Sequence, residues 1–187
     1  MPRMARIDLD FDLRDLDGAL FPASRLLGRP TVLVLLRHLG CLFCQEHLSL
    51  LRDHDQEIAA AGGRVAVVSF APPEHVKRFA LALGHPYLWL SDPERESYRA
   101  LGVGKGRVLN PFSFTDIWRN AYSTLRGRPW LPQQADLWQL GADFVFDAEG
   151  VLTMAHRCRS SHDRPPAEAV LEAFRKAAAR PEPSRRR

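Results

Sequence analysis

The chain has 187 residues and a formal net charge of +4, with 45% hydrophobic and 26% charged residues. These proportions are ordinary for a globular protein, and the length allows one domain that buries roughly 70% of the surface of its unfolded chain. Four arginines and one glutamate in residues 180–187 supply +3 of the charge. We therefore expect a single domain over residues 1–179, a disordered basic tail over residues 180–187 and no nucleic-acid partner.

The distribution of charges and cysteines limits the compartment. Seven Arg and Asp residues within residues 3–15 exclude the apolar core of a signal peptide, and no uninterrupted apolar stretch approaches the length of a membrane span. Three cysteines do not make a secreted disulfide framework, and a close pair in a reducing compartment is more often catalytic or metal-binding. We expect a cytoplasmic protein without a membrane partner.

The first part of the chain predicts a β-α-β unit. Residues 7–11 alternate between apolar and polar side chains and residues 13–18 end in a turn signal, so we expect an N-terminal hairpin. The aliphatic run over residues 31–36 does not alternate, which predicts a central strand covered on both faces. A helical pattern over residues 44–62 then leads to a second buried strand over residues 64–70.

The remaining chain alternates further helices and strands around one irregular segment. We expect, in order, a helix over residues 72–83, a strand over 87–90, a helix over 95–101, a hairpin over 143–156 and a last helix over 167–179. Residues 108–140 fit no sheet pattern and are predicted to be an insertion. A short amphipathic helix over residues 114–121 would pack its aromatic side chains onto the core, or would form a lid over a pocket.

Two cysteines lie where the central strand is expected to end. Cys41 stands just before a helix N-terminus, where free N–H groups and the helix dipole stabilise a thiolate, and Arg37 and His38 add positive charge. Because the thiolate is the nucleophile, the sequence predicts that Cys41 attacks the substrate. Cys44 lies one helical turn further on, close enough to form a disulfide with Cys41.

The order of the predicted elements resembles the thioredoxin fold in its peroxiredoxin-like form, over about residues 8–176. The segments RHLGCLFCQEH, LSDPERESYRALGV and FVFDAEGVLTMAHR are similar to the AhpC/TSA-type peroxiredoxin-like family, and to the prostamide/prostaglandin F synthase-type proteins of the same branch. Arg37, Cys41 and Cys44 match the Arg-x-x-x-Cys-x-x-Cys motif of that branch. The resemblance implies an α/β fold in which helices flank a central mixed sheet, with an N-terminal hairpin and an insertion before the last hairpin.

The resemblance implies a thiol-disulfide redox enzyme that reduces hydrogen peroxide or organic hydroperoxides through the two cysteines. No metal or cofactor is expected, and an external dithiol such as a thioredoxin-like protein would reduce the disulfide. Typical peroxiredoxins have proline and threonine where this chain has Val34 and His38, which predicts slow peroxide reduction. Thioredoxins have a cis-proline where this chain has Gly141. The arginine that polarises peroxide in peroxiredoxins corresponds best to Arg164, with Arg157 as the competing candidate.

Two alternatives and several residue roles stay open. One alternative is a specialised reductase of an endoperoxide or a metabolite disulfide, with its pocket shaped by the insertion. The other is a zinc-stabilised binding module, in which the two cysteines of the motif join Cys158 and His162 in a Cys3His site. We expect His38 and His47 to be solvated. The sequence does not decide between a monomer and a homodimer.

Overall fold

The computed structural model describes residues 5–106, 136, 138–160 and 162–180, and these residues form one mixed sheet. Its seven strands have the order β2-β1-β5-β4-β3-β6-β7. The strands are β1 (Asp12–Arg14), β2 (Leu20–Pro22), β3 (Thr31–Leu35), β4 (Arg64–Ser69), β5 (Leu88–Ser91), β6 (Ala142–Phe146) and β7 (Leu152–Arg157).

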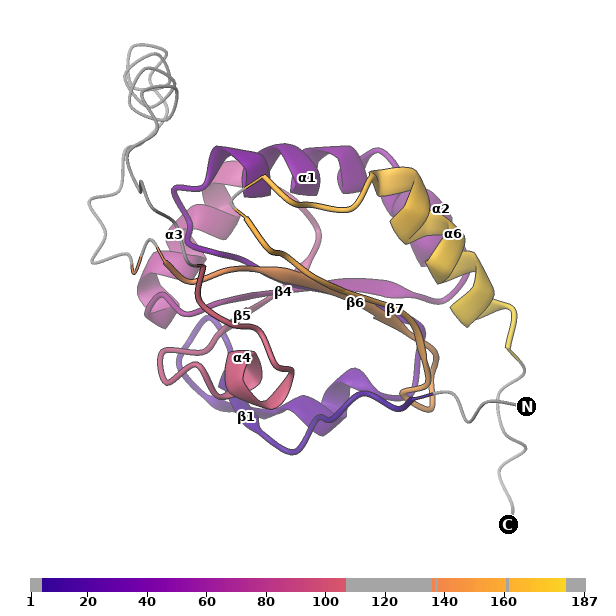
Figure 1. Ribbon diagram of the computed structural model, residues 1–187, viewed down its shortest axis with the longest axis horizontal. Helices are drawn as coiled ribbons and strands as arrows, with labels where there is room; N and C mark the ends of the chain where they lie inside the picture. Colours follow the sequence, from indigo (N-terminus) through magenta and orange to yellow (C-terminus); the bar gives the residue numbers. More distant parts are fainter. Residues whose placement is uncertain (1–4, 107–135, 137, 161, 181–187) are drawn as a thin grey trace.

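Helices cover both faces of this sheet (Figure 1). They are η1 (Ala23–Leu26), α1 (Leu42–Arg52), α2 (Asp55–Ala60), α3 (Pro73–Leu83), α4 (Glu96–Ala100) and α6 (Ala167–Ala178). One buried cluster joins α1, α2, α3 and α6 to the upper face of the sheet in Figure 1, and a second joins η1 and α4 to the lower face. The predicted mixed sheet flanked by helices is confirmed.

The central strand explains where the cysteine pair lies. β3 is parallel to β4 and antiparallel to β6, and all five of its residues are buried. Val32 and Val34 face the helices α1 and α6, whereas Leu33 and Leu35 face η1 and α4. The strand is therefore covered on both faces, as its aliphatic run predicts. Its carboxyl end leads within a few residues into α1.

The helix that follows the central strand differs from the prediction. It begins at Leu42, with Cys41 as its N-cap, and it ends at Arg52, after which α2 is a separate short helix. The break falls at Asp53 and His54, where no apolar side chain is available to hold the helix on the core. By contrast, α3 ends at Gly84 with φ of 63°, the left-handed conformation that glycine supplies, as the sequence predicts.

The N-terminal hairpin is present but lies further along the chain than predicted. β1 pairs with β2, and residues 7–11 form no strand of their own. The turn is closed by Asp15, whose Oδ1 accepts hydrogen bonds from the backbone N–H groups of Asp17 and Ala19 at 2.9 Å. The turn chemistry of Asp15 to Gly18 therefore determines the position of the hairpin, rather than the alternation before it.

Two predicted segments fall outside the residues that the structure describes. These are the insertion, of which residues 107–135 and 137 are not described, with its proposed helix over 114–121, and tail residues 181–187. At the end of the insertion, Asp136 forms ion pairs with Arg95 and Lys105, both at 2.7 Å. Within the described ranges, no helix has the length and apolar character needed to cross a membrane.

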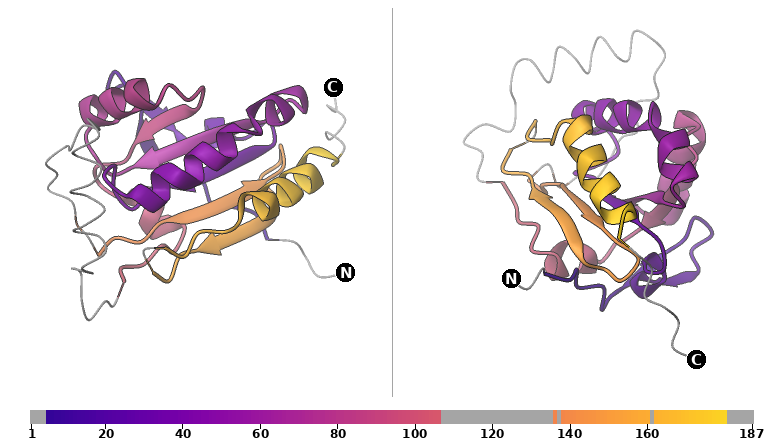
Figure 2. Two further views of the ribbon diagram at one scale, coloured as in Figure 1. Left: turned by 90° about the horizontal axis from the view of Figure 1, so that it is seen from above. Right: turned by 90° about the vertical axis from the view of Figure 1, so that its right-hand side faces the viewer.

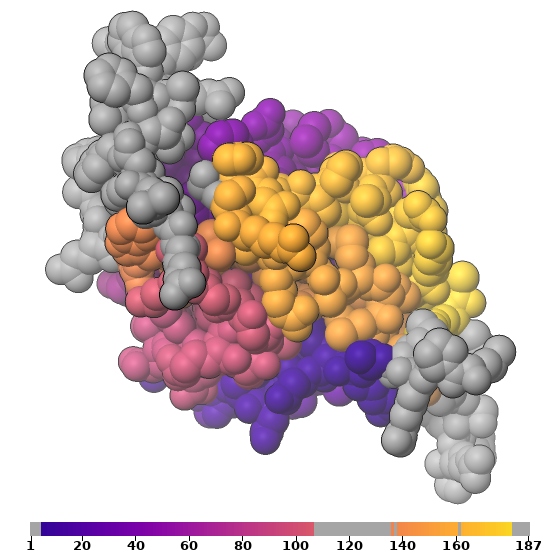
Figure 3. Space-filling model, in the orientation of Figure 1, coloured from indigo at the N-terminus to yellow at the C-terminus, as the bar shows by residue number. Residues whose placement is uncertain are grey.

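The C-terminal part of the chain completes the surroundings of α1. Figure 2 shows α6 beside α1 on the same face of the sheet, in contact with it. In Figure 3 the segment from β6 to α6, coloured orange to yellow, covers much of the visible face next to α1. The loop from β7 to α6 therefore lies close to the amino-terminal half of α1, which carries the cysteines.

Candidate active site

The Cys41 sulfur lies at the N-terminus of α1. Cys41 Sγ accepts a hydrogen bond from the backbone N–H of Cys44 at 3.3 Å, and the Cys41 carbonyl oxygen accepts the N–H groups of Cys44 and Gln45 at 3.1 Å. The Cys41 N–H in turn donates to the His38 carbonyl oxygen at 3.2 Å. A thiol in this N-cap position faces the positive end of the helix dipole, as the sequence predicts.

Arg37 lies beside the Cys41 sulfur. Its Nη1 is 4.0 Å from Cys41 Sγ, and its Nε donates to the backbone carbonyl oxygen of Gln139 at 3.3 Å. Gln139 is itself buried, and its side-chain amide donates to the carbonyl oxygens of Val103, Gly104 and Leu140. The half-buried Arg37 is thus held by the backbone at Gln139, whose own side chain is fixed by three hydrogen bonds.

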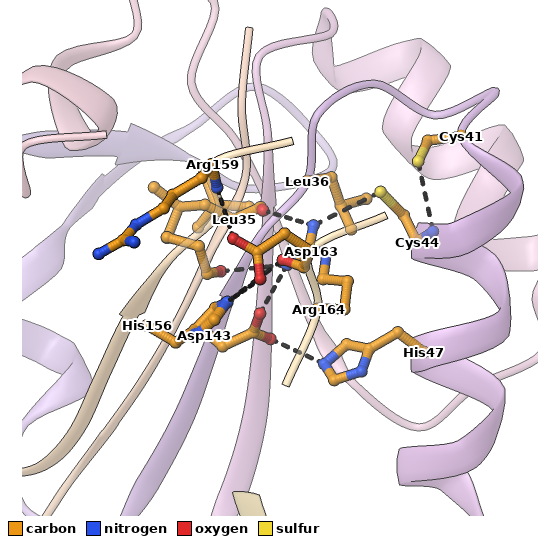
Figure 4. A network of polar contacts seen from close by, with 12 residues as sticks. Leu35, Leu36, Cys41, Cys44, His47, Asp143, His156, Arg159, Asp163 and Arg164 are labelled. Atoms are coloured by element: carbon orange, nitrogen blue, oxygen red, sulfur yellow. Dashed lines mark hydrogen bonds and ion pairs between the residues drawn. The ribbon is translucent and has the colours of Figure 1, made fainter. Parts of the chain in front are cut away.

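A second arginine contacts Cys44. Arg164 comes from the loop between β7 and α6, and its Nη2 lies 3.4 Å from Cys44 Sγ (Figure 4). Its guanidinium also donates to the backbone carbonyl oxygens of Leu35 at 3.0 Å and Ala142 at 3.3 Å. Only 7% of the Arg164 side chain is exposed. Of the two candidate arginines beyond the hairpin, the one that reaches the cysteine pair is Arg164.

A buried carboxylate and a histidine complete the charges around Arg164. Asp143 Oδ2 accepts from Arg164 Nη1 at 2.7 Å, and Asp143 Oδ1 lies 2.8 Å from His47 Nε2. In Figure 4, His47 and Cys44 both point from α1 toward this group. The expectation that His47 is solvated is wrong, because its ring is 3% exposed. The sequence analysis did not identify Asp143 as a site residue.

The two sulfurs differ in their tendency to ionise. The hydrogen bond with Cys44 and burial raise the pKa of Cys41 well above its usual value, and the charge of Arg37 opposes this only in part. Burial also opposes ionisation of Cys44, but the Cys41 thiol, the charge of Arg164 and a backbone N–H of Arg37 lower the pKa of Cys44 well below its usual value. The sequence predicted the more acidic thiol at Cys41. In the structure, the Cys41 thiol and the Arg164 guanidinium both lie beside Cys44 and favour ionisation of Cys44 instead.

Asp143 is ionised in these surroundings. Burial disfavours its carboxylate, but the charge of Arg164 and the contact with His47 lower the pKa of Asp143 to about 2. The Arg164 guanidinium therefore has a permanent counter-ion. Removal of either partner would leave the other charge buried without compensation.

The other candidate residues lie outside this arrangement. Arg157 donates from Nε to the Leu101 carbonyl oxygen at 2.7 Å and lies over the Phe144 ring, on the lower face of the sheet in Figure 1. Burial raises the pKa of Cys158 to about 12, so this thiol is not activated. The His162 ring packs against Phe43. Among the described residues, no group of three or more His, Cys, Asp or Glu side chains is placed to hold a metal ion, so the geometry gives the Cys3His hypothesis no support.

Known proteins share the fold of this chain and part of its sequence. The chain is 25% identical over 169 residues to the Peroxiredoxin-like 2C proteins of Mus musculus and Homo sapiens, which covers 83% of this chain and 70% of each relative. Its fold is similar to Peroxidoxin BcpB from Mycobacterium tuberculosis, with a TM-score of 0.66 and 21% identity over 94% of this chain and 97% of that one. Peroxiredoxin Q from Xanthomonas campestris gives 0.65 and 18%, over 94% and 96%.

A likeness also extends to another branch of thiol proteins with this fold. A putative thiol:disulfide interchange protein DsbE from Chlorobium tepidum has a TM-score of 0.61 and 16% identity, over 95% of this chain and all of that one. At these identities the solved structures show the fold alone, and they confirm the predicted thioredoxin-like, peroxiredoxin-type architecture. The sequence model of the AhpC/TSA family matches residues 7–155, which is most of the chain and includes both cysteines of the pair. This chain therefore belongs to the AhpC/TSA family.

Proposed function

We propose that this protein is a peroxiredoxin-like thiol peroxidase that reduces hydrogen peroxide or organic hydroperoxides through Cys41 and Cys44. The observation that supports this most is the Cys41 sulfur at the N-terminus of α1, 3.3 Å from the Cys44 N–H and 4.0 Å from Arg37 Nη1. These donors oppose the effects that raise the pKa of Cys41, and they favour negative charge on a peroxide oxygen beside its sulfur. Cys44, three residues further on, is the partner for a disulfide.

The proposed reaction has three steps. The Cys41 sulfur attacks a peroxide oxygen, the O–O bond breaks, and the products are a sulfenic acid on Cys41 and an alcohol or water. The Cys44 sulfur then attacks Cys41, which releases the hydroxyl group and forms the disulfide. An external dithiol, such as that of a thioredoxin-like protein, reduces the disulfide. These steps need no metal or organic cofactor.

The surroundings of Cys41 favour a slow first step. His38 stands three residues before Cys41, where typical peroxiredoxins have threonine, so the hydroxyl group of that threonine is missing here. Val34, buried in β3, stands where they have proline. The loss of one donor to the developing charge costs on the order of 3 kcal/mol, or about a hundredfold in rate. We therefore expect peroxide reduction well below the diffusional ceiling.

The experiment that tests the proposal counts free thiols and zinc in the purified reduced protein, before and after one equivalent of hydrogen peroxide. We expect two of the three thiols to be lost, and peptide mapping to show a Cys41–Cys44 disulfide. Cys41→Ser should abolish the reaction, and Cys158→Ser, the control, should leave it unchanged. A Cys41–Cys158 disulfide would contradict the role of Cys44. Stoichiometric zinc would favour the Cys3His module, and no reaction with any hydroperoxide would favour the endoperoxide or metabolite-disulfide reductase.

A further inference from the structure

Arg37 approaches the sulfur with one part of its guanidinium and is fixed by another. Its Nη1 lies 4.0 Å from Cys41 Sγ, and its Nε donates to the Gln139 carbonyl oxygen at 3.3 Å. A guanidinium is rigid and planar, so an acceptor bound at Nε restricts where the Nη atoms lie. The position of the Gln139 carbonyl oxygen therefore influences where the charge of Arg37 meets the sulfur.

Asp136 fixes the turn that presents this oxygen. Its Oδ1 accepts the backbone N–H of Trp138 at 3.1 Å, and its carbonyl oxygen accepts the N–H of Gln139 at 3.0 Å. Its Oδ2 lies 2.7 Å from both Arg95 Nη1 and Lys105 Nζ, and its side chain is 18% exposed. The contact with Lys105, supported by Arg95 and opposed by burial, lowers the pKa of Asp136 to about 2. The carboxylate is therefore charged at neutral pH and binds both cations.

The two cations are anchored in other parts of the fold. Arg95 is the N-cap of α4, and its guanidinium lies over the Phe70 ring, 4.4 Å from the ring centroid. Lys105 forms an isolated β-bridge with Gln139. Hydrogen bonds between charged groups are stronger than those between neutral groups. The ion pairs of Asp136 therefore join the turn to α4 and to the segment that carries Lys105.

We propose that Asp136 and Gln139 are positioning residues that orient Arg37 for the first step of the reaction. The ion pairs of Asp136 hold the turn, the turn holds the Gln139 carbonyl oxygen, and that oxygen directs the guanidinium toward Cys41. This inference rests on the proposed peroxidase function and adds two residues to those that the reaction uses. Because both residues act through Arg37, their effects should disappear when Arg37 is removed.

Alkylation measures the effect of the Arg37 charge on Cys41 without peroxide. The background is the Cys44→Ser/Cys158→Ser variant, in which Cys41 is the remaining thiol of the three in the chain. The rate of its reaction with iodoacetamide, followed against pH, reports the pKa of Cys41 because the thiolate is the nucleophile. The charge of Arg37 lowers this pKa, so a displaced guanidinium should raise it.

Two variants of the turn should displace the guanidinium. Asp136→Asn keeps an oxygen for the Trp138 N–H and removes the charge of the carboxylate. In the single-thiol background it should raise the pKa of Cys41 by about half a unit, which is about a threefold loss of thiolate. The direction is decisive, because the loss of a nearby negative charge would by itself lower a thiol pKa. Gln139→Leu removes the amide that anchors the turn and should act in the same direction.

Arg37→Met tests whether both residues act through the arginine. In the single-thiol background with Arg37→Met, neither Asp136→Asn nor Gln139→Leu should raise the pKa of Cys41 further. With all three cysteines present, hydrogen peroxide should oxidise Cys41 about tenfold more slowly in each turn variant, because a small displacement of a positioned group is costly. Combined with Arg37→Met, each turn variant should be no slower than Arg37→Met alone.

Asp147→Asn is the matched control, because Asp147 makes the same kinds of contact at another turn. Its Oδ1 accepts the N–H groups of Glu149 and Val151 at 2.9 Å, and its Oδ2 pairs with Arg180 at 3.1 Å. Asp147 follows β6 beside the start of β3, at the end of that strand away from the cysteines. This variant should leave both the alkylation profile and the oxidation rate unchanged.

The two measurements separate the inference from the proposed function. An unchanged or lowered pKa of Cys41 in a folded turn variant would overturn the role of the substituted residue, and if one variant does not fold, the other decides. Equal effects with and without Arg37, or an equal effect in Asp147→Asn, would overturn the inference as a whole. If the pKa rises as expected but no hydroperoxide oxidises the protein, the peroxidase function fails while the positioning of Arg37 stands.

Discussion

The two arginines beside the cysteine pair differ in how they are held. Arg37 is half-buried, lies 4.0 Å from Cys41 Sγ and is anchored by a backbone carbonyl group. Arg164 is buried, lies 3.4 Å from Cys44 Sγ and is anchored by the carboxylate of Asp143. Water screens the charge of Arg37 more than the charge of Arg164. The helix N-terminus is therefore not the only source of positive charge at the two thiols, because the buried Arg164–Asp143 ion pair lies beside Cys44.

The largest expected effect comes from breaking the buried ion pair between Asp143 and Arg164. Asp143→Ala leaves the Arg164 guanidinium buried without its counter-ion, which should lower the free energy of unfolding by about 3–5 kcal/mol. Denaturant titration measures this. The control is Asp17→Ala, which removes an ion pair of 2.6 Å with Lys77 in which both side chains are largely exposed. This variant should unfold as wild type does. If the two variants lose the same free energy of unfolding, burial does not make the Asp143 ion pair more important for stability than the exposed one.

The second prediction concerns Arg37, the more exposed of the two arginines. Arg37→Met should slow the oxidation of Cys41 by hydrogen peroxide by about a hundredfold, because it removes a donor to the developing negative charge. Stopped-flow measurement of the reduced protein gives the rate, and Arg37→Lys should recover part of it. The free energy of unfolding should change much less than in Asp143→Ala. If oxidation by peroxide is as fast in folded Arg37→Met as in wild type, Arg37 has no role in the first step.

The sheet could be predicted from the sequence because its strands have strong patterns. The aliphatic run of β3 predicts a buried strand and the sequence of β6 and β7 predicts a hairpin, and both are observed. The break between α1 and α2 was missed because both helices share one apolar pattern, with Leu51 and Ile58 both buried. The position of the N-terminal hairpin depends on side-chain hydrogen bonds of Asp15, which periodicity does not reveal.

The site was only partly predictable for a different reason. The spacing of Cys41 and Cys44 and the N-cap position follow from local sequence. Asp143 and His47 are 96 residues apart, and their contact depends on β6 lying beside β3. The signal available was a carboxylate at the start of an otherwise apolar strand, since such a group needs a buried partner. Which cation pairs with it could not be read without the fold.

The third prediction uses pH to measure how much the buried Asp143 carboxylate contributes to the free energy of unfolding. The pKa of Asp143 falls from 3.8 in the unfolded chain to about 2 in the folded protein. Its carboxylate therefore stabilises the fold above pH 3.8, and this contribution is lost as the pH falls through about 2. The shift corresponds to about 2 kcal/mol. The difference in unfolding free energy between wild type and Asp143→Asn should shrink by this amount from pH 5 to pH 2. If this difference in unfolding free energy stays constant between pH 5 and pH 2, the ion pair does not lower the pKa of the Asp143 carboxyl group.

The smallest expected effect concerns the strand end that lies between the two arginines. The hydroxyl group of Tyr98 donates to the Leu36 carbonyl oxygen at 2.6 Å, and Leu36 stands between Leu35, which accepts from Arg164, and Arg37. Tyr98→Phe should lower the free energy of unfolding by about 1 kcal/mol, because it removes one buried hydrogen bond. Denaturant titration measures this loss. Because both arginines are attached to this strand end, the variant should also slow both peroxide oxidation and disulfide closure.

The control for that variant is Tyr87→Phe, which removes a hydrogen bond of 2.9 Å to the Leu48 carbonyl oxygen and a contact with Asp55. It should cost a similar free energy of unfolding and leave both reaction rates unchanged. If Tyr98→Phe loses stability yet reacts at wild-type rates, the strand end does not need this bond to position the arginines. In that case the side-chain and backbone partners of Arg37 and Arg164 are sufficient to hold the two charges at the two sulfurs.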